Sequence, residues 1–130
     1  MREPQWLTLE IHMSNRKILF IQIELVGDRE QFVADAEKLA VPIANVPGLI
    51  WKMWLTNEGT NTFGGLYLFE SEEAMLKFFD GPVAAEISKK PEFANVEMKS
   101  FDVMEAPSLV GRTPLGENLE WRRFKSSSSS

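Results

Sequence analysis

The sequence contains no cysteine and a single histidine, His12. Without cysteine the chain cannot form a disulfide, use a thiolate nucleophile, or bind an iron–sulfur cluster or a Cys-based zinc ion. One histidine also excludes a His-rich metal site within one chain. The sequence has no GxSxG elbow, Walker loop or GxGxxG either, so triad hydrolysis, phosphoryl transfer and dinucleotide redox chemistry lack support. We therefore expect no metal and no cofactor.

Long apolar runs and an excess of positive charge are also missing. No stretch of about 18 apolar residues could span a membrane. The chain has 14 Lys and Arg against 19 Asp and Glu, a net charge of −5, which opposes the electrostatic attraction behind nucleic-acid binding. The first residues lack the apolar stretch of a secretory signal. These absences predict a cytoplasmic protein that binds neither membrane nor nucleic acid.

A length of 130 residues suggests one domain with short tails. We divide the chain into an N-terminal extension (1–16), a domain (17–106), a C-terminal arm (107–125) and a disordered serine tail (126–130). Residues 6–13 alternate like a half-buried strand; alternatively, His12-Met13 marks an internal start or a cloning junction, and the extension is foreign to the domain. The apolar residues of the arm suggest that it lies on an apolar surface: Leu109, Leu115, Leu119, Trp121 and Phe124.

The domain shows alternating strand and helix patterns. We expect strands at 18–25, 49–56, 62–70 and 96–104, helices at 28–40 and 72–80, and a short helical piece at 83–89. Asp28 and Ser71 are the candidate N-caps, and Pro42 should end the first helix. The order β-α-β-β-α-β predicts an α+β, ferredoxin-like fold, a four-stranded antiparallel sheet with both helices on one face.

The strand patterns indicate that both faces of the sheet are apolar. In the first strand, Leu19, Ile21 and Ile23 should face the helices. Trp51 and Trp54 must point to opposite sides of the sheet, because side chains alternate along a strand. A module of roughly 90 residues cannot cover all this surface with two helices. We therefore expect a homodimer in which two sheet faces meet and enclose a pocket.

The same alternation assigns residues to this pocket. Lys52 is a poor choice beneath helices, so we place it with Trp54 on the pocket side. Gly65 is placed there too, with Leu66 and Leu68 toward the helices, and the last strand stays open between Met98, Ser100, Asp102 and Lys99, Phe101. The predicted lining is Phe20, Gln22, Glu24, Lys52, Trp54, Tyr67 and Phe69. Such a pocket suits a flat apolar ligand with one or two oxygens, although simple core or interface packing explains the aromatic residues equally well.

Four residues are the catalytic candidates. Glu24 is a candidate general base if burial raises its pKa, and His12 is the only imidazole. Lys52 would stabilise a phenolate or enolate, and Tyr67 would donate its hydroxyl to a substrate oxygen. Each has a structural alternative: a solvated Glu24, an ion-paired Lys52 at the dimer rim, a surface His12, and a Tyr67 bonded to the backbone.

Two segments carry distinctive motifs: Pro47 to Trp54 reads PGLIWKMW, and Gly64 to Phe69 reads GGLYLF. They resemble the PGFLWKVW-like and GGIYLF-like strands of the YdhR-type monooxygenase family. The ending FDVME resembles an FDVNE-type motif, and the resemblance covers about residues 17–108. It implies a dimeric α+β barrel. The wider superfamily includes cofactor-independent monooxygenases of polycyclic phenols, and also cyclases, dehydratases, decarboxylating enzymes and members with no settled reaction.

The leading hypothesis is a cofactor-independent monooxygenase acting on a planar aromatic or enolisable small molecule. Phe20, Trp54 and Tyr67 would stack on the substrate, Glu24 or His12 would take a proton, and Lys52 with Gln22 would hold the oxyanion. The alternative is a non-oxidative cyclase or dehydratase, or a protein that binds an apolar ligand. A third reading is a dimeric scaffold whose pocket is filled by side chains.

Overall fold

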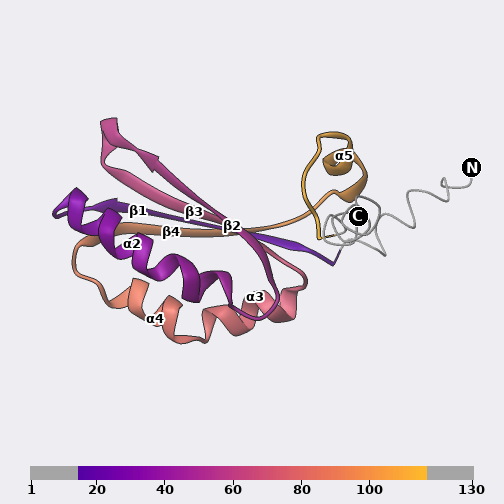
Figure 1. The fold of residues 1–130 in the computed structure, drawn as a ribbon, viewed down its shortest axis with the longest axis horizontal. Helices are drawn as coiled ribbons and strands as arrows, with labels where there is room; N and C mark the ends of the chain where they lie inside the picture. The colour runs from indigo at the N-terminus through magenta and orange to yellow at the C-terminus, as the bar shows by residue number, and fades with distance from the viewer. Residues whose placement is uncertain (1–14, 117–130) are drawn as a thin grey trace, which may run out of the picture.

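The computed structural model describes residues 15–116, and its core is a four-stranded sheet (Figure 1). The elements are β1 (Lys17–Leu25), α2 (Arg29–Ala44), β2 (Leu49–Asn57), the 3₁₀ helix η1 (Glu58–Thr60), β3 (Thr62–Phe69), α3 (Glu72–Phe79), α4 (Pro82–Lys89), β4 (Phe93–Asp102) and α5 (Glu105–Val110). Every strand pair is antiparallel, in the order β2-β3-β1-β4. This is the predicted ferredoxin-like α+β fold.

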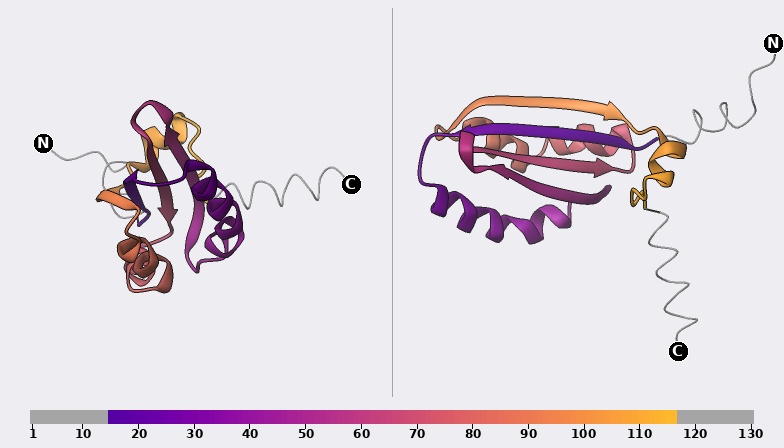
Figure 2. Two further views of the ribbon diagram at one scale, coloured as in Figure 1. Left: turned by 90° about the vertical axis from the view of Figure 1, so that its left-hand side faces the viewer. Right: turned by 90° about the horizontal axis from the view of Figure 1, so that it is seen from above.

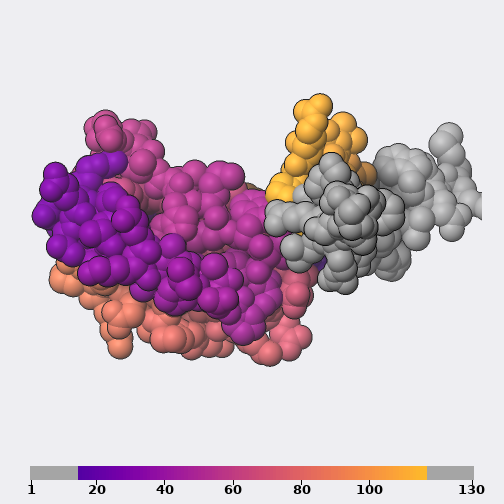
Figure 3. Space-filling model, in the orientation of Figure 1, coloured from indigo at the N-terminus to yellow at the C-terminus, as the bar shows by residue number. Residues whose placement is uncertain are grey.

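The helices are divided between the two faces of the sheet. Helices α2, α3 and α4 lie on one face, and α5 stands at one end of the other face (Figures 1 and 2). Seen from above in Figure 2, α2 runs beside the edge strand β2, while α3 and α4 lie behind the sheet. In the space-filling view α2 covers the front, with the β2–β3 hairpin above it and α3 and α4 below (Figure 3). No helix in the described part is long and apolar enough to cross a membrane.

Both predicted helix caps are confirmed. The Asp28 carboxylate accepts a hydrogen bond from the Glu30 N–H at 3.0 Å, and the Ser71 hydroxyl accepts one from the Ala74 N–H at 3.1 Å. The expected stop at Pro42 is wrong, because α2 continues to Ala44. Proline removes its own N–H bond to the previous turn and crowds the carbonyl there, but the backbone N–H of Asn45 still closes the helix onto the Val41 and Pro42 carbonyls.

The strand pairing corrects the predicted faces of β3. Leu19 pairs with Tyr67 and Ile21 with Gly65, and paired residues point to the same side of a sheet. Leu19, Ile21 and Ile23 do face the helices, as predicted, but Tyr67, Gly65 and Phe69 face them too. Leu66 and Leu68 lie on the opposite face, which we call the outer face. The sequence could not show this because both sets are apolar.

The last strand begins and ends earlier than expected, at 93–102 instead of 96–104. Phe93 starts it by packing its ring on Phe32, with the ring centres 5.7 Å apart. The register decides the face that the sequence left open: Met98 pairs with Ile21 on the helix side. Phe101, which pairs with Ile18, lies on the outer face.

The helix side holds the larger core. Tyr67 and Phe69 are at most 1% exposed, and both rings pack on Phe78 of α3, with ring centres 5.0 and 5.5 Å apart. Ile43 is the one buried residue of α2. The sheet is thus sealed over its centre by α3 and α4, whereas α2 packs more openly.

The α5 segment covers one end of the outer face and was not predicted as a helix. Leu115 is fully buried against Leu68 and Val103, while Leu109 is 46% exposed. The Trp51 indole N–H donates to the Pro114 carbonyl at 2.7 Å. The rest of the outer face keeps large exposed side chains, among them Met53, Leu55 and Phe101. His12, the possible strand at 6–13, the end of the arm and the serine tail lie outside the described residues.

Candidate functional site

A cavity of about 300 Å³ lies between the helix side of the sheet, α2 and α4. Its volume is at the lower end of the roughly 300–1,000 Å³ that small-molecule sites occupy. The walls are mainly aliphatic and aromatic: Ile21, Ile23, Leu25, Phe32, Leu39, Ile43, Trp54, Phe63, Val83, Ile87 and Phe93. A flat apolar molecule fits such a lining.

The cavity exists because α2 does not close on the centre of the sheet. Apolar residues of α2 such as Phe32 and Leu39 line the space, yet neither is buried. A second pocket of about 280 Å³ shares Phe32, Trp54 and Phe63 with the first and is lined by residues of α2 and β2. The hollow therefore continues toward the edge of the sheet.

Lys52 is the cationic side chain that reaches over the sheet into this space. Its Nζ lies 3.3 Å from the centre of the Trp54 ring and 4.4 Å from the centre of the Tyr67 ring. A glycine makes room for it: a Cβ at Gly65 would come within 2.8 Å of the Lys52 Cε. The absence of a side chain at Gly65 therefore lets this lysine come close to β3.

Burial changes the proton affinity of both polar groups. It lowers the pKa of Lys52 from 10.5 to about 7 and raises the pKa of Tyr67 well above its usual range, because an apolar setting disfavours each charged form. The two ring faces oppose the shift at Lys52 by stabilising the ammonium. At neutral pH Tyr67 is therefore a neutral hydroxyl donor, and Lys52 can either hold or accept a proton.

The Lys52 amine contacts two ring faces, but the hydrogen-bonding capacity of both groups is unused. Within residues 15–116, the Lys52 amine and the Tyr67 hydroxyl have no hydrogen-bond or ion-pair partner, and both residues line the cavity. Neither atom is fully enclosed, because no fully buried polar side-chain atom of the described residues lacks a hydrogen-bond partner. Both atoms are therefore open to the cavity, where an oxygen atom of a bound molecule would supply a partner.

Charged residues stand at the rim. Asp28 and Asp35 line the cavity from the α2 side, and Lys90 and Glu92 line it from the segment before β4. The described lining includes no His or Cys, and no group of three or more metal-binding side chains occurs within residues 15–116. The described part of the site thus offers an amine and a phenol, not an imidazole or thiolate for a metal.

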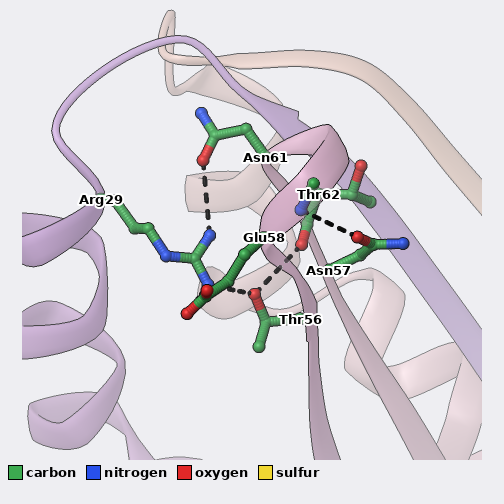
Figure 4. A network of polar contacts seen from close by, with 7 residues as sticks. Arg29, Thr56, Asn57, Glu58, Asn61 and Thr62 are labelled. Carbon is green, nitrogen blue, oxygen red and sulfur yellow. Dashed lines mark hydrogen bonds and ion pairs between the residues drawn. The ribbon is translucent and has the colours of Figure 1, made fainter.

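A polar network joins α2 to the hairpin tip beside the cavity (Figure 4). The Arg29 guanidinium donates to the Thr56 hydroxyl at 2.6 Å and to the Asn61 side-chain oxygen at 3.4 Å, and it lies 3.6 Å from the Glu58 carboxylate. It also sits 4.6 Å above the Phe63 ring. We call these contacts the Arg29 clasp; they hold the first turn of α2 against β2 and β3.

Three of the predicted pocket residues come together in the cavity, namely Lys52, Trp54 and Tyr67. Their predicted roles remain predictions. The pocket itself is not where we expected it, because it lies on the helix side of one chain and not on the outer face. The predicted face of Lys52 and Trp54, away from the helices, is wrong: Lys52 pairs with Tyr67 and Trp54 with Gly65 on the helix side. A lysine is tolerated beneath these helices because they leave a cavity there.

Four other predicted residues lie elsewhere. Phe20, Gln22 and Glu24 point to the outer face, since they alternate with Ile21 and Ile23 along β1. Glu24 is exposed and accepts a hydrogen bond of 2.7 Å from the Asn95 side chain, so its carboxylate faces away from the cavity. Phe69 is buried in the core and does not line the cavity.

Three aromatic residues that line the cavity were not predicted from the sequence, namely Phe32, Phe63 and Phe93. Phe32 and Phe63 have ring centres 4.0 Å apart, and Phe93 packs on Phe32. Phe32, Ala36 and Leu39 recur along α2 at helical spacing, a pattern that is typical of ordinary core packing. Spacing alone could not distinguish a residue that fills the core from one that borders a cavity.

Comparisons with known proteins agree with this fold. A family model described as "Putative mono-oxygenase ydhR" matches residues 18–114. A search of curated proteins finds no significant match. Among solved structures, a protein of unknown function from Nitrosomonas europaea is 21% identical with a TM-score of 0.59, covering 72% of this chain and 94% of its own.

Two further structures carry described activities. SnoaB from Streptomyces nogalater, described as a cofactor-independent oxygenase, is 13% identical with a TM-score of 0.59, over 71% of this chain and 96% of its own. MhuD from Mycobacterium tuberculosis, a heme-degrader with two hemes bound in its active site, is 21% identical with a TM-score of 0.54, over 67% and 94%. At these identities the two neighbours show a shared fold.

Proposed function

Because the chain belongs to the ydhR mono-oxygenase family, we propose that it is a cofactor-independent monooxygenase acting on a planar aromatic or enolisable small molecule in the cavity. The observation that carries the proposal is the pair of unpartnered polar groups, the Lys52 amine and the Tyr67 hydroxyl, in an otherwise apolar space. SnoaB, which shares the fold, is described as an oxygenase without a cofactor. That description supports the choice of reaction.

The chemistry follows from the properties of the two groups. Neutral Lys52 accepts the acidic proton of a phenol or enol, and the resulting ammonium, together with the Tyr67 hydroxyl, stabilises the oxyanion. Trp54 and Phe63 flank the ring system of the substrate from two walls of the cavity. This assignment moves the base from Glu24, which faces away from the cavity, to Lys52.

The substrate itself then reacts with O₂. Its carbanion gives two electrons to O₂, and a C–O bond forms to a hydroperoxide. Loss of water from the hydroperoxide breaks the O–O bond and leaves a carbonyl group. The sum is R₂CH₂ + O₂ → R₂C=O + H₂O, in which the substrate supplies both reducing electrons. The protein contributes orientation, proton transfer and the electrostatic stabilisation of the oxyanion.

Oxygen uptake by purified, metal-free protein tests the proposal, with anthrone-like and naphthol-like compounds as substrates. We expect saturable uptake that is absent after heat denaturation. Lys52→Met should lower the rate about 100-fold, the order of loss for removing one oxyanion donor, and Tyr67→Phe by about 10-fold. Lys38→Met, which removes an exposed lysine of α2, is the matched control. Absence of uptake together with saturable quenching of Trp fluorescence would contradict oxygenase activity and favour a non-oxidative or ligand-binding role.

We also propose that the protein is a homodimer formed through the outer face. Met53 is 51% and Phe101 53% exposed there, and apolar surface concentrated on one sheet face is typical of a protein interface. A second copy offers the same face, as a two-fold dimer requires. In this arrangement each cavity belongs to one chain and lies away from the interface.

A further inference from the structure

Lys52 is placed as an amine that can react. Its Nζ is held between the faces of Trp54 and Tyr67 at 3.3 and 4.4 Å from their centres. Within the described chain no carboxylate pairs with it. The other titratable groups around the cavity are Asp28, Asp35, Tyr67, Lys90 and Glu92. The amine therefore faces open apolar space instead of a counter-ion.

Such a lysine differs chemically from those on the surface. With its pKa lowered to about 7 by burial, about half of the Lys52 side chains are neutral at pH 7. An ordinary lysine at that pH is neutral in roughly one molecule in several thousand. A desolvated amine in a hydrophobic pocket is a recognised way to activate lysine as a nucleophile.

The space beside the amine suits one class of electrophile. The cavity of about 300 Å³ has room for the ring of an aromatic aldehyde or ketone, and Phe32 and Phe63 supply apolar walls. The Tyr67 hydroxyl is a hydrogen-bond donor without a partner in the described chain. A carbonyl oxygen lying between Lys52 and Tyr67 would accept that hydrogen bond and become more electrophilic.

We propose that Lys52 captures aromatic aldehydes and ketones in this cavity as a Schiff base. The nitrogen lone pair forms a C–N bond to the carbonyl carbon, and the carbonyl π electrons move to oxygen, which takes a proton. The carbinolamine then loses the oxygen and two protons as water, leaving C=N. The reaction needs no oxidant, so it goes beyond the oxygenase proposal and does not depend on it.

Reductive trapping tests the inference in the intact protein. We would incubate the protein at pH 7 with 2-naphthaldehyde and cyanoborohydride under nitrogen, and map the adducts by mass spectrometry. Hydride addition to C=N gives a secondary amine that carries the mass of the aldehyde less one oxygen. We expect Lys52 to be labelled at least about 10-fold faster than the exposed residues Lys38, Lys77 and Lys89. Even labelling of all four lysines, or an unlabelled Lys52, would overturn the proposal.

Two controls separate a reactive site from a merely accessible one. Lys52→Arg keeps a cation at this position but has no amine that can form the imine. Fast labelling at position 52 should therefore be lost, while the other lysines label as in the wild type. Denatured wild-type protein should lose the selectivity, because every lysine is then solvated. Labelling at Lys52 should rise with pH through about 7 and level off; a rise that continues toward pH 10 would contradict the proposal.

Failure of this inference and failure of the oxygenase proposal give different results. Trapping is anaerobic, so trapping without oxygen uptake would support the Schiff base and contradict the oxygenase. Oxygen uptake that depends on Lys52, without trapping, would support the oxygenase and contradict the Schiff base. Protection of Lys52 from labelling by 2-naphthol, which cannot form an imine, would show that both chemistries use the same cavity.

Discussion

The free energy of placing Lys52 in an apolar cavity depends on its protonation. A group whose pKa falls from 10.5 in the unfolded chain to about 7 in the fold binds fewer protons in the folded state between those two pH values. The contribution of Lys52 to the free energy of unfolding therefore rises with pH across that window and is constant below it. The ring faces of Trp54 and Tyr67 reduce the effect because they stabilise the ammonium.

Lys52→Met should remove this pH dependence. Relative to the wild type, we expect the variant to gain roughly 4–5 kcal/mol of unfolding free energy at pH 6.5, and the gain to vanish as the pH approaches 10.5. Urea unfolding at several pH values measures the difference. The matched variant Lys38→Met changes an exposed lysine of α2 and should show no such trend. A gain that is independent of pH would show that Lys52 remains charged in the fold.

Among the elements, α2 makes few buried contacts with the sheet for a helix of 16 residues. It buries only Ile43 and borders the cavity for much of its length. The Arg29 clasp fastens its first turn to the hairpin tip through Thr56, Glu58 and Asn61. Because few buried apolar contacts oppose local opening, we expect α2 to control access to the cavity at this end.

Arg29→Gln should loosen that end without unfolding the protein. We expect a loss of about 1 kcal/mol of stability, since the contacts are partly solvated, and faster hydrogen exchange confined to the first turns of α2 and to η1. Release of a bound naphthol should accelerate several-fold in stopped-flow measurements. Lys38→Gln on the same helix is the control. Uniform acceleration of exchange across the sheet would assign Arg29 a global role in stability instead.

At the scale of the whole molecule, the two faces of the sheet differ in how much of each is covered. The helix side carries the core and the cavity, and α5 shields only one end of the outer face through Leu115. What remains uncovered is a patch centred on strands β1, β2 and β3, with Phe101 at its edge in β4. A homodimer would bury it and would stiffen the sheet that supports Lys52 and Tyr67.

A pair of charge substitutions tests this assembly. Phe101 on the outer face and Leu76 on α3 have nearly equal exposure, 53% and 51%, so Phe101→Glu and Leu76→Glu change similar amounts of exposed apolar surface. Light scattering should give twice the 14.8 kDa chain mass for the wild type and Leu76→Glu, and one chain mass for Phe101→Glu. A wild-type particle of 14.8 kDa would contradict the dimer.

The sequence by itself determined the elements and their order. Strand alternation, helical stripes and the caps at Asp28 and Ser71 are local features, set by residues within a few positions of each other. They were sufficient for the ferredoxin-like fold and for the orientation of β1. Alternation also placed Lys52 and Trp54 together on one face of their strand.

Only the tertiary structure decided the side of the sheet on which the site lies. Both faces of β2 and β3 are apolar, so alternation gave two equivalent solutions, and the register with β1 selected one of them. The cavity depends on how far α2 stands from β2, a distance that no local pattern encodes. The same distance decides whether Phe32 borders a cavity or fills the core. It also decides whether Lys52 is a desolvated amine or a surface charge.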